Sequence, residues 1–188
     1  MIETWCAPTS VRWYPEGEHC DDPIAGDIIL VNHGTSLAWA ISSGQTLASH
    51  LWRRDLKGYT WLDHCGIIRG GVDGFIVSEM GPRGHEFRSL AHYQDRLYAI
   101  ANFAVGDLSR ARVLASDTRL HGIEYGFIQY PSLVINGLTS AAIAASYGES
   151  MICSTHVAWC AKNEYFTLDR QDNAAIPADI AKIIGARR

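Results

Sequence analysis

Three strand-like runs that follow one another in the middle of the chain constrain its fold more than any other feature. They cover residues 64–69, 75–80 and 97–103, and each carries a cluster of apolar side chains. The glycine-rich connection at 70–74 predicts a hairpin between the first two runs. Antiparallel strands can be joined by such short connections, whereas parallel strands need a long crossover. The runs therefore predict a largely antiparallel sheet.

The segments around these strands are expected to be mainly helical. Helical spacing of apolar residues, or residues typical of helix boundaries, marks segments at about 36–54, 107–121, 131–147, from about 153 onward, and after 177. Strands that follow one another, with helices in separate segments, favour the α+β class. A chain of 188 residues is expected to form one domain, spanning residues 1–188.

Three further segments complete the predicted fold. Residues 1–23 show no clear periodicity and are expected to form an irregular N-terminal arm. Residues 24–31 lead from a Gly-Asp turn into a run of apolar side chains, which predicts a buried strand. Residues 81–85 have the composition of a surface loop.

Composition limits the classes of function. The formal net charge is −4, and nothing resembles the basic patch that nucleic-acid-binding proteins usually carry. The apolar stretch at 133–145 is interrupted by polar residues and is too short to span a bilayer. No secretory signal is visible, and five cysteines without a disulfide spacing suit a reducing compartment. We expect a protein that is cytoplasmic as synthesised, binds no nucleic acid and has no stable membrane insertion. Its oligomeric state stays open.

Cys153 is the best candidate for a nucleophile. The sequence around it predicts the start of a helix, with Ser150 as the N-cap and the cysteine in the first turn. The N–H groups of a first turn have no intrahelical acceptor, and the helix dipole is positive at that end. Both effects favour a thiolate over a thiol.

A cysteine nucleophile needs a base and a group that orients the base, and His64 and Glu79 fit these roles. His64 begins the first of the three runs, and Glu79 lies near the end of the second. Antiparallel pairing across the hairpin would make them neighbours. Glu79 would then hold His64 and favour its protonated form, which stabilises the thiolate of Cys153.

Two alternatives use His156. It lies at i+3 from Cys153 on the same expected helix, so it competes with His64 as the base, although no partner that would orient it can be named. A zinc site could instead use Cys153, His156 and Cys160, with a fourth ligand from Cys65 or Cys20. Structural zinc sites usually take closely spaced ligand pairs from two segments, so this ligand set is the weaker interpretation, and we expect no cofactor.

The order of the motifs resembles that of the circularly permuted NlpC-type papain-like cysteine peptidases. The motifs are Gly26-Asp27-Ile28-Ile29, His64-Cys65-Gly66-Ile67-Ile68, Val77-Ser78-Glu79 and Ile152-Cys153-Ser154-Thr155-His156-Val157. The chain is similar to the YiiX-like members and, more distantly, to lecithin:retinol acyltransferase. In this branch the histidine precedes the cysteine, reversing the papain order. The resemblance runs from about residue 26 to 181.

The resemblance implies a papain-like fold and assigns Cys153 as nucleophile, His64 as base and Glu79 as the third, polar member. Two departures affect the substrate class: Thr155-His156 replaces an acidic residue common after Cys-Ser, and Cys65 replaces an aliphatic residue. The implied activity is hydrolysis of amide or peptide bonds, with peptidoglycan peptide stems as the substrate class and a phage- or lysis-associated setting. Alternatives are a lipid amide or ester hydrolase, an acyltransferase, or a non-catalytic cell-wall or ligand-binding module.

Overall fold

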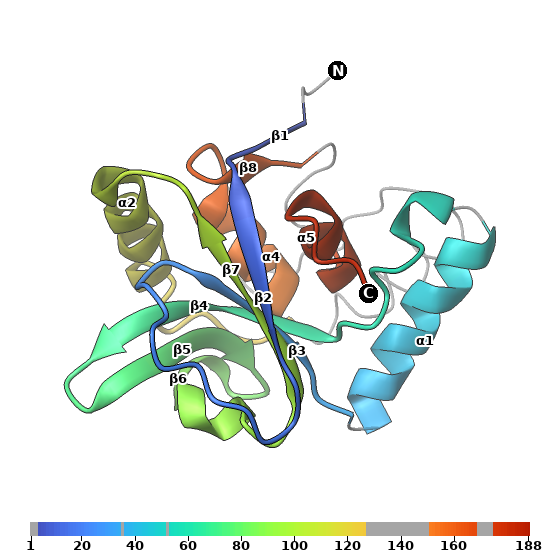
Figure 1. Cartoon of the computed structure of the whole chain (residues 1–188), viewed down its shortest axis with the longest axis horizontal. Coiled ribbons are helices and arrows are strands. Elements are labelled where there is room, and N and C mark those ends of the chain that lie inside the picture. The colour runs from blue at the N-terminus through green and yellow to red at the C-terminus, as the bar shows by residue number, and fades with distance from the viewer. Residues whose placement is uncertain (1–3, 35, 52, 127–150, 169–174) are drawn as a thin grey trace.

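A six-stranded antiparallel sheet is the centre of the part of the chain that the structure describes (Figure 1). The computed structural model describes residues 4–34, 36–51, 53–126, 151–168 and 175–188. The strand order is β2-β7-β3-β4-β5-β6, and every neighbouring pair is antiparallel. A second, two-stranded antiparallel sheet is formed by β1 and β8. The α+β class with antiparallel sheets is therefore confirmed.

The elements have the following bounds. The strands are β1 (Trp5–Cys6), β2 (Thr9–Tyr14), β3 (Ile28–Asn32), β4 (His64–Gly71), β5 (Gly74–Gly81), β6 (Gly84–Ser89), β7 (Leu97–Phe103) and β8 (Phe166–Thr167). The helices are α1 (Ser36–Leu51), α2 (Asp107–Thr118), α4 (Cys153–Ala161) and α5 (Pro177–Ile183), with short 3-10 turns η1 (Arg54–Leu56) and η2 (Leu90–Tyr93).

Both faces of the large sheet carry a cluster of buried side chains, and the alternation of side chains along its strands assigns each residue to one face. Ile28 and Leu30 of β3 join a core cluster that includes residues of α4 and α5, whereas Ile29 and Val31 join a cluster on the opposite face. The second cluster includes Tyr93 of η2. This strict alternation is expected of a strand that packs on both sides. We call the two sides the helix face and the η2 face.

The Gly-Asp turn before β3 is a structural anchor. Asp27 is buried and forms an ion pair with Arg110 of α2, with Nη1 and Oδ1 2.8 Å apart. Gly26 has φ of +96°, and a Cβ atom there would lie 2.6 Å from the Tyr165 hydroxyl. Only glycine fits this backbone conformation and this space without rearrangement. The turn therefore fixes β3 against the helices.

Two parts of the predicted fold are wrong. The expected irregular arm contains β2, which pairs with β7 along its whole length. The expected loop at 81–85 is a tight turn into β6, which pairs with β5. The hairpin, the strand at 97–103 and the helices that begin at Asp107, Cys153 and Pro177 are confirmed. The helix expected at 131–147 lies outside the described residues.

No helix among the described residues has the length and apolarity needed to cross a membrane.

Candidate active site

Cys153 is the first residue of α4, at the end of the helix that meets β4. The residue in the cap position is Ile152, and no side chain caps the helix there. The N-cap is therefore not the expected Ser150, which lies outside the described residues, although Cys153 lies in the first turn as predicted. Because the apolar Ile152 side chain cannot cap the helix, it leaves the partial positive charge of the first-turn N–H groups available to a thiolate or an oxyanion.

His64 and Glu79 meet as the hairpin prediction required. Nε2 of His64 lies 2.6 Å from Oε2 of Glu79. The paired register reaches Ile67 opposite Ser78, so one further step places Glu79 opposite Gly66 and diagonal to His64 on the same face. A Cβ atom at Gly66 would lie 2.8 Å from the Ser78 carbonyl oxygen and 3.4 Å from Cβ of Glu79. The glycine therefore permits the close approach that joins the two side chains.

Two further residues hold the Glu79 carboxylate. The Tyr93 hydroxyl donates to Oε2, the same oxygen that His64 contacts. Arg88 of β6 forms an ion pair with Oε1, at 2.5 Å from its Nε. Sequence reasoning missed both residues, because η2 and β6 were not predicted. Together they orient the carboxylate toward His64 from two sides.

The electrostatics of this pair favour charged forms on both side chains. Burial by itself would lower the pKa of His64, but the negative charges of Cys153 and Glu79 outweigh it and raise the pKa to about 10. Burial would likewise raise the pKa of Glu79, yet His64, Tyr93 and Arg88 bring it to about 2. Between these values the pair is an imidazolium and a carboxylate.

The Cys153 thiol interacts with two residues of β4. Hydrogen bonding by Cys65 makes the largest contribution to lowering its pKa, and burial opposes this. The charge of His64 and a hydrogen bond from His64 lower the pKa further, so that it falls well below the usual range. The pKa of the Cys65 thiol is raised instead, because this thiol is buried and is hydrogen-bonded to the negatively charged Cys153. Of these two cysteines, Cys153 therefore carries the negative charge.

His33 is a further residue beside His64 that sequence reasoning did not single out. Its ring lies edge-on to the His64 ring, with centroids 4.7 Å apart. Asp63 holds its position: the carboxylate accepts from the His33 backbone N–H at 2.9 Å and lies 3.0 Å from Nδ1. Arg96 donates to the His33 carbonyl oxygen at 2.6 Å. These bonds fix the side chain that borders His64.

In the structure, Cys153 and His156 contact different residues, which counts against both alternatives that use His156. His156 is fully buried, and its Nε2 lies 2.7 Å from Oδ1 of Asp117, whereas Cys153 interacts with His64 and Cys65. Asp117 is thus the residue that orients His156, which the sequence did not identify. The ligand set of the weaker zinc interpretation is not brought together in the described part of the chain, where the one group of three or more potential ligands is His85, Asp117 and His156.

No protein-family model matches the chain, and no curated protein matches it either. A thiolate at a helix N-terminus, an imidazolium beside it and a carboxylate behind the imidazole can together perform nucleophilic attack and proton transfer. Uncapped N–H groups at the same helix end can stabilise an oxyanion.

Proposed function

We propose that the chain is a cysteine-dependent hydrolase that cleaves amide or peptide bonds through an acyl-enzyme on Cys153. The observation that carries the proposal is the combination of a lowered pKa at Cys153 with a raised pKa at His64, in a pair whose histidine is held by Glu79 at 2.6 Å. A structural cysteine in an apolar core has the opposite shift, as Cys160 does, where burial raises the pKa.

In the proposed reaction, the Cys153 thiolate attacks the carbonyl carbon and the oxyanion faces the first-turn N–H groups of α4. The imidazolium of His64 gives its proton to the leaving amine as the C–N bond breaks, which leaves a thioester on Cys153. His64 then takes a proton from water as the water attacks the thioester. The acid leaves, and the thiolate and imidazolium are restored. Glu79 keeps the imidazole in the orientation that both proton transfers require.

The motif order supports assignment of this activity to a circularly permuted NlpC-type papain-like fold. A histidine at the start of one sheet strand, an acidic side chain on the next and a cysteine at the start of a later helix form the pattern on which the resemblance rests. By this analogy the substrate class is peptidoglycan peptide stems, an inference from fold and motif order alone.

A lipid amide or ester is the second candidate substrate, and the surface of α1 favours it. Trp39, Leu47 and Leu51 are 72%, 47% and 46% exposed and fall along one side of this helix. An exposed apolar stripe suits a fatty-acyl chain better than a peptide stem. The two substrate classes can be separated by measuring hydrolysis of a peptide amide and of a long-chain acyl amide by the native protein and by Trp39→Ser. If the substrate is a lipid, the variant should hydrolyse only the acyl amide more slowly.

The test of the catalytic proposal is the pH dependence of iodoacetamide alkylation, with peptide mapping to identify each cysteine. We expect Cys153 to react fastest of the five cysteines, with a midpoint well below the value of about 8.5 for a free thiol. His64→Ala should move the midpoint upward, and Glu79→Gln should do so more weakly. Cys160 in the same digest is the internal control and should stay unreactive. A Cys153 midpoint near that of a free thiol, or one unchanged in His64→Ala, would refute the triad.

A further inference from the structure

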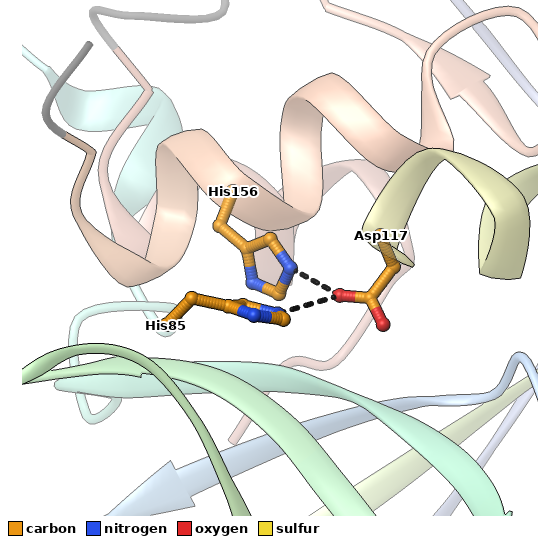
Figure 2. Close-up of side chains that lie close together, drawn as sticks. All are labelled: His85, Asp117 and His156. Atoms are coloured by element: carbon orange, nitrogen blue, oxygen red, sulfur yellow. Dashed lines mark hydrogen bonds and ion pairs between the residues drawn. The ribbon is translucent and has the colours of Figure 1, made fainter. Parts of the chain in front are cut away.

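A second cluster of ionisable side chains lies on the helix face of the sheet, apart from the proposed catalytic residues. Figure 2 shows His156 of α4 and His85 of β6 directed at the carboxylate of Asp117, which belongs to α2. Nε2 of His156 lies 2.7 Å from Oδ1 of Asp117, and Nε2 of His85 lies 3.2 Å from the same oxygen. All three side chains are fully buried.

The spacing of these atoms is close to that of ligands around one metal ion. The potential ligand atoms of the three residues all lie within 4.8 Å of one another. Tetrahedral zinc with bonds of about 2.0–2.2 Å places neighbouring ligand atoms about 3.3 Å apart. The His85–Asp117 separation of 3.2 Å already fits, and the 2.7 Å separation at His156 needs to open by about half an ångström.

Hydrogen bonding explains only part of the cluster. Ser78 donates to Oδ1 of Asp117 at 2.7 Å and lies 2.7 Å from Nε2 of His85, so the inner nitrogens and the carboxylate are satisfied without an ion. Nδ1 of His85 and Nδ1 of His156, however, are both buried without a hydrogen-bond partner among the residues that the structure describes. Two buried imidazoles that each have one unpaired nitrogen are unusual, because buried polar atoms generally have hydrogen-bond partners. An ion held by the two Nε2 atoms and Asp117 would leave these Nδ1 atoms unpaired, so the spacing of the inner atoms is the observation that favours an ion.

The groups around Asp117 resemble the outer shell of a metal site. Arg69 of β4 forms an ion pair with Oδ2, and Ser78 holds Oδ1. Outer contacts of this kind commonly orient the carboxylate ligands of metal sites. The positive charge of Arg69 offsets part of the charge of Asp117. This lowers the expected affinity of the site for a cation, so prolonged treatment with excess EDTA should remove a bound ion.

We infer that His85, Asp117 and His156 form a binding site for one divalent transition-metal ion of the zinc type. Two imidazoles and one carboxylate are a donor set that zinc accepts, whereas magnesium and calcium prefer oxygen ligands. The ion would join β6, α2 and α4, three elements that are distant in sequence. Because α4 also begins with Cys153, the ion would fix the helix that carries the proposed nucleophile. The inference does not depend on the proposed reaction.

The test begins with the native chain, treated with EDTA, desalted and reconstituted with Zn²⁺. Bound zinc is measured by plasma mass spectrometry, and its ligands by X-ray absorption at the zinc edge. We expect one zinc per chain, with two imidazoles and no sulfur among its ligands. This measurement needs no variant, so it remains valid if substitutions in the buried cluster prevent folding.

The variants locate the ion. His85→Gln and His156→Gln should each weaken zinc binding at least tenfold, as measured by competition with a chromogenic chelator. His121→Gln is the matched control, because its ring is 6.3 Å from the His85 ring but makes no bond to Asp117. Cys153→Ser controls for zinc held by the reactive thiolate. Both controls should bind as the native chain does. Absence of stoichiometric zinc, sulfur ligands, or binding retained in the folded His85 and His156 variants would overturn the inference.

Discussion

Two buried histidine–carboxylate clusters lie on opposite faces of the β4–β5 hairpin, and adjacent residues of β5 contact different clusters. Glu79 of β5 holds His64 on the η2 face, whereas the preceding residue, Ser78, contacts Asp117 on the helix face. Helix α4 also contributes residues to both clusters. Its first residue, Cys153, interacts with His64, and His156, three residues on, contacts Asp117.

The clusters differ in what surrounds the imidazole. The His64 side chain is 12% exposed and faces a thiol, whereas those of His85 and His156 have no exposed surface. A partly exposed imidazole can exchange protons with a substrate or water; a sealed one cannot. The same pair of residue types therefore supports reactivity in one place and cohesion or metal binding in the other.

The largest effect should come from removing the nucleophile. Cys153→Ala should lower amide hydrolysis by about 10⁴-fold or more, because covalent catalysis is then impossible and only binding and the oxyanion donors remain. The measurement is the rate on an amide substrate that the native protein cleaves. Circular dichroism should show an unchanged fold, since the substitution removes one sulfur atom. Activity retained in Cys153→Ala would refute Cys153 as the nucleophile, and with it the contrast between a reactive cluster and a fully buried one.

Asp117→Asn should have the largest effect on stability. Four side chains surround the carboxylate, and the neutral amide would leave the Arg69 charge without a counterion. Breaking a buried ion pair in this way costs about 3–5 kcal/mol in the free energy of unfolding. The measurement is urea denaturation at neutral pH.

The same variant sharpens the contrast between the clusters. In folded Asp117→Asn protein, the alkylation midpoint of Cys153 should match that of the native protein, because Cys65 and His64 are the groups that lower its pKa most. A shift as large as that of His64→Ala would show that the clusters act as one unit.

Glu79→Gln should change stability in a defined pH window. The pKa of Glu79 is lowered from an ordinary 4.5 to about 2 in the folded chain, so its ionised form stabilises the fold above pH 4.5. That contribution, about 3 kcal/mol at most, is lost as the pH falls from 4.5 to 2. Urea midpoints measured from pH 7 to 2 should therefore show a large deficit in the variant at neutral pH that shrinks toward pH 2. A deficit independent of pH would mean that the lost interaction is not ionic.

The sequence predicted the contact between His64 and Glu79 because its signals are local. A glycine-rich turn sets the register of one hairpin, and that register places His64 near Glu79. Pro177 and the run after Cys153 mark helix starts that the structure contains. These inferences needed only a few adjacent residues, whereas the pairing of Cys153 with His64 rested on the order of motifs far apart in the chain. Pairing of β4 with β5 then followed from the general geometry of hairpins.

The Asp117 cluster could not be predicted, because it depends on contacts between distant segments. His156 and Ser78 are each 39 residues from Asp117 in sequence. The strand that carries His85 is β6, whose mostly polar sequence lacks the apolar alternation of a half-buried strand. An acidic residue within an amphipathic helix such as α2 normally faces solvent.

The smallest predicted effect is that of Tyr93→Phe. Glu79 would lose one donor and keep His64 and Arg88, so the expected cost is about 1 kcal/mol in the free energy of unfolding. Oε2 would then interact with His64 alone, which keeps the imidazole protonated; the alkylation midpoint of Cys153 should move downward or stay constant. Tyr98→Phe is the control, since Tyr98 is buried on the same face but donates to a backbone oxygen at 3.4 Å. It should leave the midpoint unchanged. An upward shift in Tyr93→Phe, comparable to that of Glu79→Gln, would make Tyr93 a principal orienting group, because the carboxylate would then depend on it to hold His64.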